Sequence, residues 1–456
     1  MTSTQITYFD RFRNNLVFQL GSQHFDEFWC RSVLRESFHD EGVRQIVLGL
    51  GALSHALEGV THDVPLHENT FLTITNKHYT QAMKLYAQSL NRFRTQLATS
   101  GTRAVKRNVL ISSILFSAFE VLHGNSATSD SLMIHGVGLL KDELLKSTLS
   151  LQQSMVAASI DDEGIEDAEF LLMRRLTLRA LLSSQKLQQQ VSDIISGCCF
   201  SLRSVTVVPA QGQPFQILWK LWMRFFTLAL MWSVKIEVLM NVNGQLLIPS
   251  QHLIDDQDSM LEQIDAWARI AEAKSATETN ESARQVLRKL LTGSKGLRIY
   301  IETTLGDRDS MSTDQIAAVK EIFDLAESIL AETPIFQQGL GEVYDGIQCM
   351  TFGLAMKLRN QYLRTRAVRL ARKMVKSQSR WDFKEIYMVF CTLVDIEEKE
   401  RNEDGTIPFE RRYIWKYSTW RQNYTLLDVC FEKPKSMEGV CNEKRMLLRP
   451  TNFGFN

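Results

Sequence analysis

The sequence predicts an all-α fold, built as a multi-helix stack of antiparallel helical hairpins with an irregular C-terminal tail. Apolar residues recur at steps of three and four along most of the 456 residues, which is the period of an amphipathic helix. Strand-like alternation is nearly absent, and the chain has only 8 prolines. Because 44% of its residues are hydrophobic and 23% are charged, the chain can bury a large core and is not a disordered protein.

The helix expected over residues 42–57 is the packing centre of this fold, because it is apolar on most sides and carries almost no charge. Asp40 provides an N-terminal cap, and Gly59 can end the last turn in the left-handed conformation. Gly49 and Gly51 each cost the helix about 1 kcal/mol relative to alanine. We therefore expect a neighbouring helix to pack closely against the bare backbone, and Gly51→Leu to unfold the opening helices.

Three regions are expected along the chain. Residues 1–150 form an opening helical bundle, with helices at 9–20, 24–37, 42–57, 68–97, 107–123 and 130–145. Residues 151–410 hold the remaining helices of the same domain, at 170–185, 215–242, 259–273, 281–303, 313–332, 341–360, 363–377 and 383–401. Gly124 ends the helix at 107–123, and the acidic run Asp161–Glu169 is the expected linker or exposed loop. Residues 411–456 have no clear period and form the irregular tail.

The overall charge points to no particular class of partner. Lys plus Arg and Asp plus Glu both total 52, so no global field attracts nucleic acid or a membrane surface. The most apolar stretch, Phe215–Met240, is interrupted by four charged residues and is not expected to cross a membrane. The 7 cysteines are scattered without metal-ligand spacing, and the N-terminus has no signal-peptide pattern, so a soluble intracellular protein with reduced thiols is expected.

Searches for catalytic motifs predict no catalytic residue, no cofactor and no metal site. The glycines of Gly49–Ser54 lack the third glycine of a phosphate loop, and no nucleophile elbow or zinc-protease helix is present. An active site assembled from distant residues stays open as an alternative. The histidines His55, His62, His67 and His78 lie close in sequence, but their spacing matches no ligand pattern, so structural roles are the preferred interpretation.

Aromatic residues concentrate in one segment of the middle region. They are Trp219, Trp222, Phe225, Phe226 and Trp232. If the chain has a ligand pocket, we expect it among this segment, Trp267 and the opening helices. Core packing explains the same helical spacing and is preferred.

The one local charge anomaly is Lys357–Arg380, a basic run that contains no acidic residue. Five of its residues share one helical stripe and form a candidate partner-contact face: Arg366, Arg369, Lys373, Lys376 and Arg380. This face suits nucleic acid or an acidic partner. The preferred alternative is a solvated face that the acidic segment Asp382–Asp404 neutralises.

Several short segments carry a resemblance to a known family. Val47–Glu58, Asn108–Glu120 and His135–Leu140 resemble the opening helices of the regulatory (middle homology) domain of fungal zinc binuclear cluster transcription factors. Arg364–Met374 and the later Trp381-Asp382 and Glu397-Glu398 pairs resemble a late arginine-bearing helix of that family and the residues beyond it, so the resemblance covers most of the chain loosely. It implies an all-α regulatory domain.

The same resemblance implies a function without naming a target. Family members carry an N-terminal six-cysteine, two-zinc module that contacts DNA, and here only Cys30 lies in the first hundred residues. Direct DNA binding by this chain is therefore not expected. The expected role is transcription regulation in the nucleus, often of a secondary-metabolite gene cluster, through protein partners, a small-molecule ligand or a second copy of the chain. An enzyme or accessory protein of a biosynthetic cluster, and a helical scaffold, stay open as alternatives.

Overall fold

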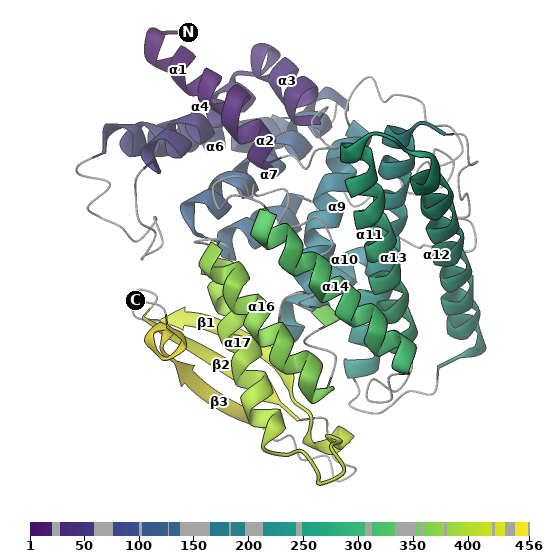
Figure 1. Cartoon of the computed structure of the whole chain (residues 1–456). Coiled ribbons are helices and arrows are strands. Elements are labelled where there is room, and N and C mark those ends of the chain that lie inside the picture. Colours follow the sequence, from purple (N-terminus) through teal and green to yellow (C-terminus); the bar gives the residue numbers. More distant parts are fainter. Residues whose placement is uncertain are drawn as a thin grey trace.

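A computed structural model confirms that the chain is mainly α-helical (Figure 1). It describes residues 1–20, 28–58, 76–99, 103–125, 127–136, 165–181, 184–196, 213–242, 249–305, 312–332, 353–354, 359–377, 381–421, 425–433 and 443–454. Within these residues, strands occur only in a small sheet near the C-terminus.

The opening bundle is drawn in purple and blue in Figure 1. Its elements are α1 (Ser3–Arg11), the π-helical segment η1 (Phe12–Leu16), α2 (Val17–Leu20), the π-helical segment η2 (Phe28–Val33), α3 (Leu34–His39), α4 (Glu41–Ala56), α6 (Lys77–Thr99) and α7 (Arg103–His123). Helix α4 packs against α1, α3, α6 and α7, which confirms that it is a central helix.

The cap of α4 is the one that the sequence predicts. Val43 donates its backbone N–H to Oδ1 of Asp40 over 2.8 Å. The second oxygen of Asp40 accepts hydrogen bonds from the amides of Gln96 and Asn108 at 2.7 and 3.0 Å, so one carboxylate connects α4 to α6 and α7. The predicted stop at Gly59 lies outside the described residues.

The two glycines of α4 meet their neighbours at different distances. A Cβ on Gly51 would lie 2.8 Å from the carbonyl carbon of Tyr8 in α1, and still closer to its oxygen. Only a bare backbone fits there, as predicted. A Cβ on Gly49 would lie 3.5 Å from Leu85 of α6, which is an ordinary contact, so nothing in the packing requires glycine at that position.

Helix α7 and the helical residues 127–136 form the first part of the expected hairpin, whereas residues 137–145 of its second arm lie outside the described residues. Gly124 ends α7 with a φ of 85°, a conformation that suits glycine. The hydroxyl groups of Ser117 and Ser129 lie 2.7 Å apart across the two arms. These small side chains allow a close approach of the arms.

The middle region consists of helices that pack against one another (Figure 1). They are α9 (Ile165–Leu181), α10 (Gln185–Ser196), α11 (Phe215–Val242), α12 (Gln251–Thr277), α13 (Glu281–Leu305) and α14 (Thr313–Glu332). The expected linker at Asp161–Glu169 is wrong in its second half, because residues 165–169 already belong to α9. The three acidic residues Glu166, Asp167 and Glu169 are compatible with the start of a helix, since they complement its dipole.

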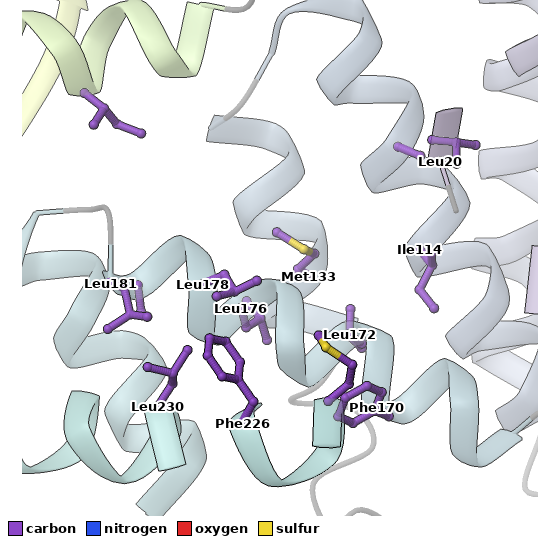
Figure 2. Close-up of a cluster of buried hydrophobic side chains, with 14 of the residues drawn as sticks. Leu20, Ile114, Met133, Phe170, Leu172, Leu176, Leu178, Leu181, Phe226 and Leu230 are labelled. Carbon is purple, nitrogen blue, oxygen red and sulfur yellow. The ribbon is translucent and has the colours of Figure 1, made fainter. Parts of the chain in front are cut away.

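Helix α11 is the main core helix of this region and contacts α9, α10 and α13. Figure 2 shows Phe226 and Leu230 of α11 beside leucines of α9. Within the described residues, Ile217–Leu239 is the one stretch that is long and apolar enough to span a membrane, but 83% of it is buried inside the fold. It therefore has the character of a core helix.

The C-terminal region combines two helices with a sheet. It contains α16 (Gln361–Ser377), α17 (Trp381–Glu398), the 3-10 turns η7 (Phe409–Arg411) and η8 (Pro450–Phe453), and the strands β1 (Ile414–Arg421), β2 (Leu426–Glu432) and β3 (Glu443–Leu448). The strands form an antiparallel sheet in the order β1-β2-β3, and a bulge lies between Trp415 and Tyr417. The sequence of the expected tail at 411–456 has no helical period, and the described part of the tail contains no α-helix. The sheet within it was not predicted.

The central strand explains why no alternation was visible. Residues Leu427 to Phe431 of β2 are all buried, including Asp428, because both faces of the strand are covered. A strand that is buried on both faces reads as a continuous apolar run, which cannot be told from a short piece of helix by its period.

Candidate functional site

Helix α16 carries the predicted basic face, and it places its charged residues in three different surroundings. Leu363, Ala367, Leu370 and Ala371 are buried and attach the helix to the fold, as the apolar strip predicted. Between these residues, the basic side chains point inward to α17, sideways to α14 or outward to solvent. The surroundings of each arginine or lysine therefore depend on its position both around and along the helix.

A buried ion pair lies on the side of α16 that faces α17. Arg364, whose side chain is 1% exposed, donates a hydrogen bond from Nη2 to Oε2 of Glu397, whose side chain is completely buried. Its other terminal nitrogen lies 3.4 Å from Oε1 of Glu398. The acidic segment thus neutralises Arg364, which is buried and does not belong to the predicted five-residue face.

Two further arginines complete a five-residue ion cluster. Arg359 donates to Oε1 of Glu397 over 3.2 Å, and Arg401 donates to both oxygens of Glu398 at 2.7 and 2.5 Å. The backbone N–H of Tyr413 donates to Glu397 over 2.7 Å. Since Tyr413 directly precedes β1, this carboxylate connects α16, α17 and the start of the sheet.

The cluster keeps both glutamates ionised. Burial alone would raise the pKa of Glu397, but the charges of Arg359 and Arg364 outweigh it and hold the pKa below its ordinary value of 4.5. Burial also acts to raise the pKa of Glu398, and its hydrogen bonds and charge interaction with Arg401 lower the pKa overall. Removing one carboxylate from such a cluster leaves buried positive charge uncompensated.

A surface pocket of about 320 Å³ lies beside this cluster. Its wall comes from Ile316 of α14, from residues 359–362 at the start of α16, and from Arg401 and residues 405–407 of the loop after α17. Arg359 and Arg401 thus belong to both the ion cluster and the pocket. The pocket is not in the aromatic segment where a ligand site was expected.

The sideways arginine, Arg366, pairs with α14. Its Nη2 contacts the carboxylates of Asp324 and of Glu327, the latter at 3.3 Å, and its guanidinium lies 5.7 Å from the ring centre of Phe323. Only 17% of its side chain is exposed. Arg366 therefore belongs to the contact between α14 and α16 rather than to an open surface, and its carboxylate partners lie outside the acidic segment that was expected to supply them.

The outward residues of the predicted face are Arg369 and Lys373, which are exposed. Within the part of the chain that the structure describes, neither forms an ion pair. Lys376 lies in the last turn of α16, and Arg380 lies outside the described residues. The structure thus separates the five-residue face into one residue that is paired inside the chain and two that are open.

Two of the four histidines come together. The rings of His55 and His78 stack at 4.2 Å, and Nδ1 of His78 lies 2.8 Å from the hydroxyl of Tyr8. Burial, followed by the charges of His55 and Lys77, lowers the pKa of His78. No group of three or more metal-ligand residues gathers among the described residues, and His62 and His67 lie outside them.

The aromatic segment of α11 packs as core. Trp219, Trp222, Phe225, Phe226 and Trp232 are each at most 7% exposed. The rings of Trp222 and Trp267 meet edge to face at 5.6 Å. These rings fill space between helices, which agrees with the preferred interpretation.

Sequence reasoning missed the pocket, because its residues come from three separate segments. The pair Glu397-Glu398 at the end of α17 was a signal, since a carboxylate buried beside apolar residues needs cationic partners. No protein-family model, no curated protein and no solved structure matches the chain. The site is therefore interpreted from its own geometry.

Proposed function

We propose that this chain is a regulatory helical domain of the transcription-regulator type, which acts through an acidic protein partner that binds the exposed basic residues of α16. The observation that carries the proposal is the division within α16. Arg364 and Arg366 are neutralised inside the fold, whereas Arg369 and Lys373 are exposed. Exposed cations that form no ion pair with the described residues suit a complementary acidic surface.

The regulatory part of the proposal has a separate support. Val47–Glu58 and Arg364–Met374 resemble segments of the regulatory domain of fungal zinc cluster transcription factors. From this resemblance we infer work in the nucleus, on genes such as those of a secondary-metabolite cluster. The acidic partner is then a component of the transcription machinery or a DNA-binding regulator.

A reporter assay tests this proposal. The full chain is fused to an unrelated DNA-binding module in a fungal host, and transcription from a promoter with the matching site is measured. We expect the fusion to change reporter transcription, and the double variant Arg369→Glu, Lys373→Glu to lose most of that change because it reverses the charge of the contact surface.

The matched control is the double variant Lys84→Glu, Arg288→Glu, which makes the same change of net charge at exposed positions of α6 and α13. It should behave as the unaltered fusion. All proteins are compared at equal abundance and with equal melting temperature. The proposed function would be refuted if the fusion left reporter transcription unchanged, or if both double variants changed reporter transcription equally.

A further inference from the structure

The pocket beside the ion cluster has one charged wall and one apolar wall. Arg359 and Arg401 line the first, and Ile316 and Ile407 contribute to the second. Tyr362 lines the pocket as well, although 60% of this large aromatic residue is exposed. Such a combination of convergent polar groups and apolar surface is typical of small-molecule sites.

The two guanidinium groups are held rigidly. The side chain of Arg359 is nine-tenths buried and bound by Glu397, which is itself fixed by Arg364 and by Tyr413. Arg401 binds Glu398 through two nitrogens and also donates to the backbone oxygens of Arg359 and Gly405. A ligand would therefore meet cationic groups whose conformational entropy is already lost.

The charge around the pocket is positive overall. The cluster contains three guanidinium groups and two carboxylates. The ammonium of Lys320 lies 5.3 Å from the ring centre of Tyr362 and adds one charge, and the carboxylate of Asp404, which binds Thr406 in the pocket wall, removes one. One positive charge remains in excess, and the lowered pKa values of Glu397 and Glu398 agree with this balance.

From this geometry we infer that the pocket binds a small carboxylate with a compact apolar body. Its anionic group would lie against Arg359 and Arg401, which suit carboxylate oxygens. Its apolar body would cover the ring of Tyr362 and the two isoleucines. The volume is at the lower end of the range for ligand pockets, which favours a molecule of one ring or a short aliphatic chain.

Benzoate, benzyl alcohol and inorganic phosphate are suitable probes. Each is titrated into the full chain at constant ionic strength, and binding is followed by ligand-observed NMR. We expect benzoate to bind about tenfold more tightly than benzyl alcohol, because only benzoate makes charge-assisted hydrogen bonds. Phosphate should bind more weakly than benzoate, because it has no apolar body. Equal affinities for benzoate and benzyl alcohol, or tighter binding of phosphate, would overturn the inference.

Two variants locate the binding. Tyr362→Ala should weaken benzoate binding roughly threefold to tenfold by removing the aromatic contact. Arg401→Lys keeps the charge but loses the two-nitrogen contact, and it should weaken benzoate more than benzyl alcohol. Phe38→Ala is the matched control, since Phe38 is 59% exposed and lies far away in α3.

The result is decisive even if Arg401→Lys fails to fold, because Tyr362 is exposed and its removal leaves the ion cluster intact. If Tyr362→Ala binds benzoate as well as Phe38→Ala does, the pocket is not the binding site. The inference is independent of the proposed partner surface, because the charge reversal at Arg369 and Lys373 changes no residue of the pocket.

Discussion

The opening bundle and the C-terminal region of this chain are held together by different forces. Around α4, apolar side chains and a bare glycine backbone let α1 approach so closely that no side chain fits between them. Between α16, α17 and the sheet, a buried cluster of two glutamates and three arginines makes the central contact. The first contact is set by shape, and the second by charge.

This difference has a consequence for how each region responds to its surroundings. Apolar packing has no titrating group, so its contribution to stability changes little with pH. The ion cluster contributes only while its carboxylates are charged. The contact of α16, α17 and the sheet should therefore weaken in acid, whereas the contact of α1 with α4 should be most sensitive to added volume.

The largest effect is expected from Glu397→Gln. The amide keeps the shape of the side chain but leaves Arg359 and Arg364 without a buried counter-charge, which typically costs about 3–5 kcal/mol. Urea unfolding measures the loss, and hydrogen exchange should locate it in α16, α17 and β1. Asp395→Asn is the control: Asp395 of the same helix forms an exposed pair with Lys399 just after the helix, and its loss should cost less than about 1 kcal/mol.

The pH dependence of the same variant sharpens the comparison. Because the pKa of Glu397 is lower in the folded chain than its ordinary value of 4.5, the unfolded chain takes up this proton first as the pH falls. The stabilisation by the ion pairs of Glu397 is complete above the ordinary pKa of the carboxyl group, and it is lost as the pH falls toward the pKa of the folded chain. Wild type should thus lose stability in acid more steeply than Glu397→Gln. Equal slopes below pH 4.5 would contradict the assignment of charge as the holding force.

The second effect concerns volume in the opening bundle. Gly51→Ala forces α1 away from α4, because the new methyl group meets the backbone of Tyr8, and such overpacking costs about 1–3 kcal/mol. Gly51→Leu should separate the two helices altogether. Gly49→Ala is the matched control, since its methyl group finds ordinary contacts, and it should stabilise α4 by up to about 1 kcal/mol.

Hydrogen exchange in α1 and α4 distinguishes the two alanine variants. Protection should fall in Gly51→Ala and stay constant or rise in Gly49→Ala, while the acid response of α16 and α17 stays that of wild type in both. If Gly51→Ala is as stable as Gly49→Ala, the close approach of α1 does not exist in solution.

How far the fold could be predicted from the sequence follows from the same contrast. Helix α4 was predictable because its cap, its apolar period and its two glycines all lie within one short segment. The partner of Gly51 was not, since Tyr8 lies more than forty residues earlier and nothing near it marks a backbone contact. The small sheet escaped because β2 is buried on both faces and shows no alternation.

The candidate site could be predicted from the sequence less completely than the fold. A helical wheel placed Arg366 on the same stripe as Arg369, but only the tertiary structure shows that α14 supplies Asp324 and Glu327 to one of them. The pocket depends on Arg359 and Arg401, which are brought together through Glu397 and Glu398. A charge pattern in one segment predicts that partners exist, but it does not predict which segment provides them.

The smallest expected effect tests this division of α16. Arg366→Glu places a carboxylate beside Asp324 and Glu327, and it should destabilise the chain by roughly 1 kcal/mol, since the partners are partly exposed. Salt should reduce this loss, because screening weakens repulsion between such charges. Lys373→Glu, about two turns further along the same stripe of α16, should change stability by less than about 0.5 kcal/mol. The measurement is the urea midpoint of each variant at low and at high salt. If both charge reversals shift the midpoint equally, Arg366 is as open to solvent as Lys373 and belongs to the partner-contact face.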